Sequence, residues 1–307
     1  MRTDKALSNF IFIVFSIIVI VLISPILSIV LGILFALLYR DKANNISKKI
    51  SSYPLQIGVV LLGLTISLDS LIPIVKNYFI WASFFVILTF FICFLIGKWV
   101  GLDNKLILLL SSGSAICGAT AMAVVAPLIK AKAHTLMISL GIIFTLNTIA
   151  IILFPFFGTY LNMSDSEFGI FSALAIHDTG SVVGSALQFS NNSVESAASL
   201  KILRTLWLIP LIILLNLKFN SFNKKKSFPI FVIFFIIAVI FSNLISLSYE
   251  DVEYLKVVSQ IFISYGIFSI GLQSGGLDLR DIKPKPFMVA TSVWIIVIPV
   301  AYLISII

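Results

Sequence analysis

Long apolar runs, separated by short charged or turn-forming stretches, follow one another along the whole chain. A helix needs about 20 consecutive apolar residues to cross a bilayer. The pattern predicts about eleven membrane segments: Phe10–Ile23, Pro25–Tyr39, Tyr53–Leu68, Tyr78–Gly97, Leu106–Leu128, His134–Phe157, Phe168–Phe189, Leu200–Leu217, Phe228–Leu247, Val257–Leu272 and Phe287–Ile307. Because only Ser24-Pro25 separates the first two, they form either a helical hairpin or one long helix kinked at the proline.

The composition agrees with a membrane protein. Hydrophobic residues make up 60% of the chain and charged residues 11%, whereas a soluble domain is about half apolar and a quarter charged. No hydrophilic stretch is long enough for a soluble domain, so we expect residues 1–307 to form one all-α, polytopic domain in the cell (inner or plasma) membrane. The two cysteines lie in apolar segments, which excludes a disulfide framework and a zinc site.

The basic residues predict an orientation. The lysines and arginines lie mostly between the apolar runs and do not cluster on one element. This pattern argues against nucleic acid as a partner despite the net charge of +8. With eleven crossings and the N-terminus inside, 15 of the 21 lysines and arginines fall on inside connections and 6 on outside ones. This asymmetry follows the positive-inside rule.

Two pairs of short segments echo each other. Gly63–Asp69 is similar to Gly271–Asp278, and Ala115–Thr120 is similar to Ala175–Gly180. Many secondary transporters are built from inverted repeats, and the echoes predict such repeats here. The order along the chain is A-B-B′-A′, so either the repeat is permuted or one pairing is accidental.

Ser111–Ala123 is rich in glycine, serine and other small residues although it lies within a membrane segment. Glycine weakens a helix by about 1 kcal/mol. The segment is either a broken helix, whose half-helix N-terminus attracts an anion, or a close helix–helix contact of small residues. The candidate binding residues of the broken helix are Ser114, Cys117, Gly118 and Thr120.

His177 and Asp178 lie side by side in another apolar segment and are followed by Thr179 and Ser181. An aspartate near the bilayer centre costs about 2.5–3.5 kcal/mol, and such residues mark ion sites, proton relays or substrate paths. We therefore interpret these four residues as the second part of a binding site. The alternative is a buried neutral histidine satisfied by a neighbour.

Lys201 and Arg204 are one helical turn apart at the start of the next segment. They either extend to the membrane interface, or neutralise Asp178, or attract an anionic substrate. Asn147 lies within the His134–Phe157 segment, where a polar residue more readily joins helices than lines a path.

The motifs Ile116–Ala121, Ala126-Pro127, Phe154–Gly158, Ala175–Asp178 and Lys201-x-x-Arg204, in this order, resemble the YeiH-type family of sulfate exporters. The resemblance covers nearly the whole chain. It implies the architecture of sodium/bile-acid symporters, with two inverted repeats, two broken helices that cross, and a core that moves against a scaffold. This chain has Thr179-Gly180-Ser181 where the family commonly continues with Val/Ala-Gln-Val, so the resemblance supports an anion better than sulfate itself.

The leading hypothesis is a secondary transporter of a small anion such as sulfate, sulfite or an organic sulfonate. Proton or sodium coupling would use His177 and Asp178, since the unperturbed histidine pKa of about 6.5 suits proton coupling. No cofactor or resident metal is expected, and the partners are the anion and the lipid bilayer, with a homodimer as one compatible assembly. The alternatives are an anion channel and an intramembrane serine hydrolase with Ser112 or Ser114 as nucleophile; we expect no enzyme.

Overall fold

The computed structural model describes residues 2–50, 53–66, 68–219, 230–245, 247–276 and 284–307. Every regular element in these ranges is a helix, which confirms the all-helical fold class. The predicted basic loop Lys224–Lys226 and the echo residue Asp278 lie outside the described residues. The chain divides into two compact units, of which unit 1 holds residues 1–68 and 231–278 and unit 2 holds residues 69–230 and 279–307.

Five helices of the described part are long and apolar enough to cross a membrane: Ile72–Trp99, His134–Tyr160, Ser193–Phe219, Glu250–Leu272 and Pro284–Ser305. Shorter apolar helices of 10–17 residues accompany them. These helices support a polytopic membrane fold, while the count of eleven segments stays a prediction.

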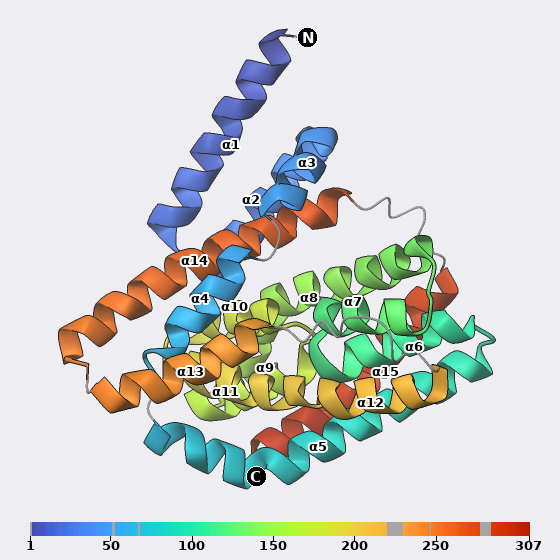
Figure 1. Ribbon diagram of the computed structural model, residues 1–307. Helices are drawn as coiled ribbons and strands as arrows, with labels where there is room; N and C mark the ends of the chain where they lie inside the picture. Colours follow the sequence, from blue (N-terminus) through green and yellow to red (C-terminus); the bar gives the residue numbers. More distant parts are fainter. Residues whose placement is uncertain (1, 51–52, 67, 220–229, 246, 277–283) are drawn as a thin grey trace. The chain divides into compact units, whose positions relative to one another are not determined.

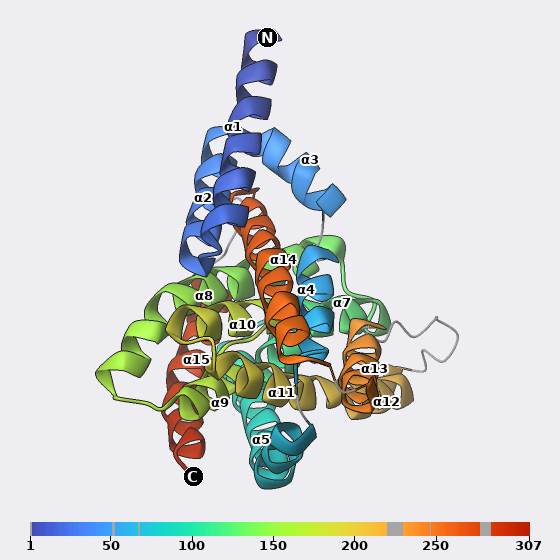
Figure 2. The ribbon, with the colours of Figure 1, turned by 90° about the vertical axis from the view of Figure 1, so that its left-hand side faces the viewer.

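Unit 1 consists of α1 (Arg2–Leu22), α2 (Pro25–Leu38), α3 (Arg40–Ile50), α4 (Tyr53–Gly63), α13 (Ile230–Ile245) and α14 (Tyr249–Gly276). The first two predicted segments are separate helices that form a hairpin (Figure 2). Ile23 has a positive φ of 45° and Ser24 caps α2 by accepting a hydrogen bond from the Leu27 backbone N–H. The ring of Phe35 on α2 lies 5.5 Å from that of Phe12 on α1, so the chain reverses instead of kinking at Pro25.

Helix α14 packs against α2 and α4 through glycines. A Cβ on Gly32 would lie 2.3 Å from the Phe268 carbonyl oxygen, and a Cβ on Gly271 would lie 2.5 Å from the Ile29 carbonyl oxygen. The Ser259 hydroxyl donates to the Gly58 carbonyl at 2.7 Å. Close approach of helix backbones at small residues is the usual way that membrane helices associate.

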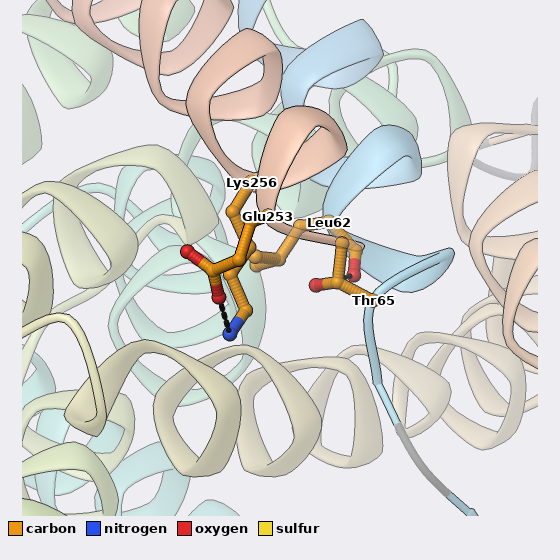
Figure 3. A network of polar contacts seen from close by, with 4 residues as sticks. All are labelled: Leu62, Thr65, Glu253 and Lys256. Carbon is orange, nitrogen blue, oxygen red and sulfur yellow. Dashed lines mark hydrogen bonds and ion pairs between the residues drawn. The ribbon is translucent and has the colours of Figure 1, made fainter. Parts of the chain in front are cut away.

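The end of α4 and the first turns of α14 carry the polar contacts that Figure 3 draws. Thr65 donates its hydroxyl to the Leu62 carbonyl at 2.8 Å just after α4 ends, and Lys256 pairs with Glu253 at 2.9 Å on α14. Gly63, the first echo residue, packs against Phe235 of α13, whereas Gly271 packs against α2. The two members of this echo therefore have different packing roles.

Unit 2 contains the other helices and both chemistry-bearing segments. Its elements are α5 (Leu68–Trp99), α6 (Asn104–Ser112), the π-helical turn η1 (Gly113–Cys117), α7 (Ala119–Leu128), α8 (Ala133–Tyr160), α9 (Asp165–Ala175), α10 (Thr179–Phe189), α11 (Ser193–Leu206), α12 (Leu208–Phe219) and α15 (Pro284–Ser305). Helix α8 has 28 residues and is about 42 Å long at 1.5 Å per residue. It is long enough to cross a membrane, so the positions of the short helices beside it can be described relative to its two ends.

Candidate functional site

The segment predicted as Leu106–Leu128 is a hairpin of two short arms. Helix α6 continues through η1 to Gly118, whose φ of 58° and ψ of −124° turn the chain back into α7. At the open end Lys105 donates to the Lys130 carbonyl at 2.8 Å. Gly113, eight residues after Lys105 and the first residue of η1, faces Met122 of α7, which lies eight residues before Lys130. This register is that of two antiparallel arms, which we call hairpin 1, with its tip at Cys117-Gly118.

The segment predicted as Phe168–Phe189 is also a hairpin. The rings of Phe168 and Phe189, the two end residues of this segment, stack with centroids 4.1 Å apart. Three residues further out, Asn192, which follows α10 and precedes α11, donates to Asp165 at the start of α9 at 3.1 Å. The arms α9 and α10 meet at the extended residues Ile176–Asp178, which form the tip of hairpin 2.

Helix α8 connects the open end of hairpin 1 to the open end of hairpin 2. It begins at Ala133, three residues after Lys130, and ends at Tyr160, shortly before α9 starts. The ends of one continuous helix are far apart, so the two hairpins start from opposite ends of α8 and extend toward its middle (Figure 1).

The two tips touch each other. A Cβ on Gly118 would lie 3.1 Å from the Cβ and 3.3 Å from the backbone nitrogen of Asp178. Of the two interpretations of the first segment, the structure therefore favours the broken helix, and the interruption of the second segment lies next to it. The arrangement differs from the crossed helices that the resemblance implies, because the positive φ at Gly118 and the extended backbone at 176–178 reverse each chain instead of letting its second half continue.

Asn147, which is fully buried near the middle of α8, holds the tip of hairpin 2. Its Oδ1 accepts from the His177 backbone N–H at 3.2 Å and contacts His177 Nδ1 at 2.9 Å, while its Nδ2 donates to Asp178 Oδ2. A backbone N–H only donates and a carboxylate only accepts, so the orientation of the amide is fixed. His177 therefore donates from Nδ1. The sequence favoured helix joining for Asn147 and missed this role.

Asp178 caps α10. Its Oδ1 accepts from the Ser181 backbone N–H at 2.9 Å and its Oδ2 accepts from the Ser181 hydroxyl at 2.6 Å, in addition to the Asn147 amide. A carboxylate at a helix N-terminus is favourable because it meets unpaired N–H groups and the positive end of the helix dipole. These donors satisfy the Asp178 charge within the protein.

Arg204 joins the first arms of both hairpins. Its Nη1 donates to the carbonyls of Ala173 and, at 2.6 Å, Leu174 on α9, and its Nη2 donates to Ala115 at 2.6 Å and Ser114 at 3.2 Å on η1. The guanidinium thus lies at the negative, C-terminal ends of two half-helices. The ring of Phe85 covers it at 5.2 Å.

Lys201 lies one turn before Arg204 and donates to the Ile176 carbonyl at 2.7 Å. Both cations have no exposed surface in the structure, so neither extends to an interface. Each binds backbone carbonyls at or beside the tips, and within the described residues neither forms a hydrogen bond or a close ion pair with the Asp178 carboxylate.

The structure brings the predicted site residues together. Ser114, Cys117, Gly118 and Thr120 lie at or next to the tip of hairpin 1, His177, Asp178, Thr179 and Ser181 at the tip of hairpin 2, and Lys201 and Arg204 beside both tips. Two residues at the tips are absent from the predicted site: Asn147, which the sequence interpreted only as a helix-joining residue, and Trp294 of α15, whose indole N–H donates to the Ala175 carbonyl at 2.8 Å.

Comparison with known proteins places the chain in a membrane-protein family. The model of the family described as Conserved hypothetical protein 698 matches residues 7–290. The chain belongs to this family. It is 32% identical over 277 residues to a UPF0324 membrane protein of Bacteroides thetaiotaomicron, covering 90% of this chain and 84% of that protein. It is 34% identical over 251 residues to the UPF0324 membrane protein PBPRB0970 of Photobacterium profundum, covering 81% and 75%. No solved structure matches.

For this family member, the names of those relatives state a membrane protein and no cargo. They support a multi-pass membrane protein, and they do not identify a sulfate exporter.

At the tips, Ala119, Thr120 and Asp178 are partly exposed, whereas residues 111–118 and 179–186 are buried. The N-cap residue of α7 is Gly118, which has no side chain with which to cap the helix, and the first turn of α7 contains the partly exposed Ala119 and Thr120.

Proposed function

We propose that the protein is a secondary active transporter of a small anion that works by alternating access, with sulfate, sulfite or an organic sulfonate as candidate cargo. The observation that carries this proposal is the contact between the two hairpin tips beside the middle of α8. Each hairpin starts from a different end of that helix, so each is suited to open toward one side of the membrane.

The depth of the irregular backbone supports a transport site. Non-helical backbone is tolerated at membrane depth only where protein covers it or where it lines a water-filled cavity. Discontinuous helices that end near the bilayer midplane form the substrate sites of many transporters. Residues 176–178 and Gly118 are such interruptions, and Asn147 shows that they lie halfway along a membrane-length helix.

The charges favour an anion. Lys201 and Arg204 are buried beside the tips, and Asp178 is the carboxylate that accompanies them. The N-terminus of α7, which begins after Gly118, adds a partial positive charge next to the partly exposed Thr120. Backbone N–H groups at a helix N-terminus are a general anion-binding device.

The distribution of lysines and arginines agrees with hairpins that enter and leave on the same side. If the segments of hairpins 1 and 2 do not cross, two of the six outside basic residues move to the inside and two others are buried in the core. The count of 15 inside and 6 outside then becomes 17 and 2. The two that move are Lys130 and Lys132, the two that are buried are Lys201 and Arg204, and the two that remain outside are Lys76 and Lys256. The positive-inside rule thus favours the hairpin topology.

The hydrolase and channel alternatives have less support. A serine nucleophile needs a base within hydrogen-bond reach. The His177 ring hydrogen-bonds to Asn147, and the Ser112 hydroxyl donates to the Leu109 carbonyl of its own helix. A channel filter is built from rings of carbonyls or charges, and the described tips instead contact each other directly.

The test is uptake of radiolabelled sulfate by proteoliposomes, with sulfite and taurine as competitors and with imposed pH and sodium gradients. We expect saturable uptake that a competing anion reduces and a gradient drives above equilibrium. Uptake equal to that of protein-free liposomes for every anion offered, from protein that is folded and monodisperse, would refute the proposal. Flux far above carrier rates would indicate a channel, and labelling by a serine-reactive phosphonate would indicate a hydrolase.

A further inference from the structure

The three charged groups at the tips differ in how the protein balances them. Arg204 donates to carbonyls of α9, the hairpin 2 tip and η1, with Phe85 over its plane. Asp178 accepts from two groups of Ser181 and one of Asn147. Lys201, by contrast, has one hydrogen-bond partner in the described residues, the Ile176 carbonyl.

An ammonium group has three N–H donors, and burying a charge without adequate partners is costly. Lys201 has no exposed surface that would let water satisfy the other two donors. A lysine in such a site differs from an arginine, because lysine readily gives up its proton when buried whereas arginine stays charged. Lys201 is therefore the group at the tips whose charge state is least fixed by its surroundings.

The neighbours of Lys201 include the other titratable groups of the site. The tip of hairpin 2 contributes His177 and Asp178, the tip of hairpin 1 contributes Cys117, and α11 itself contributes Arg204. The His177 ring donates to Asn147 and the Asp178 carboxylate is occupied by Ser181 and Asn147. None of these groups provides Lys201 with a dedicated counter-ion in the described structure.

We propose that Lys201 carries the coupled proton, which enters the site together with the anion; this rests on the transport function proposed above. In the empty site Lys201 is a neutral amine, and the charges of Arg204 and Asp178 offset each other. A bound anion supplies the negative charge that stabilises the ammonium, so Lys201 takes a proton from the loading side. The proton leaves to the other side when the anion is released, and no covalent bond changes.

The first test is pH-driven accumulation of radiolabelled sulfate in proteoliposomes with the membrane potential held at zero. With about one proton per anion, a gradient of about one pH unit drives about tenfold accumulation. We expect this ratio for the wild type and for the control Thr148→Val, whose hydroxyl bonds only to the Phe144 carbonyl of its own helix. Lys201→Arg, which keeps a permanent charge, should lower the ratio to about one whatever its exchange rate.

The same assay separates this proposal from coupling by the neighbouring groups. If Lys201→Arg still accumulates sulfate about tenfold while Asp178→Asn or His177→Gln does not, coupling belongs to the hairpin 2 tip and the proposal for Lys201 is overturned. An accumulation ratio of about one for the wild type in the presence of measurable exchange also overturns it.

A second measurement needs no transported cargo. Thermal unfolding of the purified protein in detergent is followed as the pH falls from about 9 to about 6, a range that spans the proton exchange proposed for the site. As the pH falls, Lys201 binds a proton in the unfolded chain but not in the anion-free folded core, so we expect the wild type to lose stability toward low pH and Lys201→Met to lose much less. Sulfate should restore low-pH stability to the wild type.

The two measurements distinguish the possible failures. If the wild type neither transports nor is stabilised by sulfate, the proposed cargo is wrong, and the difference in pH profile between wild type and Lys201→Met still decides the role of Lys201. Identical profiles overturn it. Should the variants not fold, proton uptake by the wild type on sulfate addition in weak buffer decides: about one proton per bound sulfate supports the proposal, and none overturns it.

Discussion

Gly118→Ala is the substitution that most directly tests the contact between the hairpin tips. Gly118 has a φ of 58° and a ψ of −124°, a conformation that side-chain-bearing residues rarely adopt. Forcing alanine into it costs about 1–3 kcal/mol. The new methyl group would also lie 3.1–3.4 Å from the Cβ, nitrogen and Cα of Asp178, tighter than ordinary contact. We expect the tips to separate by a few tenths of an ångström.

Gly101→Ala provides the matched control. Gly101 lies in the turn between α5 and α6, has a φ of 75°, and would place its Cβ with nothing within 4 Å. It therefore carries strain from a positive φ, about 1–3 kcal/mol, without any crowding. Gly101→Ala thus controls for the effect of a positive φ, while only Gly118→Ala crowds the tip contact.

The assay compares unfolding in denaturant and anion uptake for both variants. Both should lose stability, Gly118→Ala by more, and only Gly118→Ala should lose most of its uptake, because its tip no longer fits against Asp178. A loss of about 1.4 kcal/mol in a rate-determining step corresponds to about tenfold in rate. Wild-type uptake by Gly118→Ala, with a stability loss equal to that of Gly101→Ala, would show that the tip contact does not matter for transport.

Two further predictions concern α8 and the topology. Asn147→Ala removes an acceptor from the buried His177 N–H and a donor from Asp178, so we expect a loss of about 2–5 kcal/mol of stability and of most of the uptake. The control Thr148→Val should remain near wild type. Equal stability of the two variants in a denaturant titration would contradict the bridging role of Asn147. Single cysteines at the exposed positions Asn104 and Lys132 should react with an impermeant maleimide from the cytoplasmic side in intact-cell and inverted-vesicle assays, and one at Ser166 from the opposite side. Labelling of the first two positions from different sides would show that hairpin 1 crosses the membrane.

The positions of both helix interruptions were predictable from the sequence. Glycine and serine weaken a helix at residues 111–118, and an adjacent His-Asp pair is costly in an apolar segment. These are local properties, so the residues themselves indicate them. The echo between Ala115–Thr120 and Ala175–Gly180 marked both tips correctly, with Gly118 matched to the residue that it touches, Asp178.

The reversal of the chain at each tip was not predicted, because it depends on contacts between distant residues such as Phe168 with Phe189. An interrupted segment of about 22 residues has the length of one full crossing and equally of two half-crossings. A signal was present nonetheless: Lys105 and Lys130 flank the first segment on both sides, and the positive-inside rule favours the same side for both.

The roles of the polar residues on neighbouring helices were only partly predictable. The i, i+3 spacing of Lys201 and Arg204 placed both on one helical face, but their partners are backbone carbonyls, which have no sequence signature. An asparagine within an apolar segment, such as Asn147, is typical of a residue that joins helices. Only the three-dimensional fold brings it within reach of His177 and Asp178.

The Arg204 guanidinium also has a mechanical consequence. It fastens the α9 arm to the η1 turn through carbonyls on both, and separating them would leave several buried acceptors without donors, at about 1–3 kcal/mol each. In the described structure the guanidinium hydrogen-bonds to residues of α9, the hairpin 2 tip and η1, and to none of the return arms α7 and α10. The pair of arms that Arg204 joins is therefore held together more firmly than the pair of return arms. Under the proposed transport function, we expect a movement that opens one side to displace α7 or α10 while η1 and α9 stay joined.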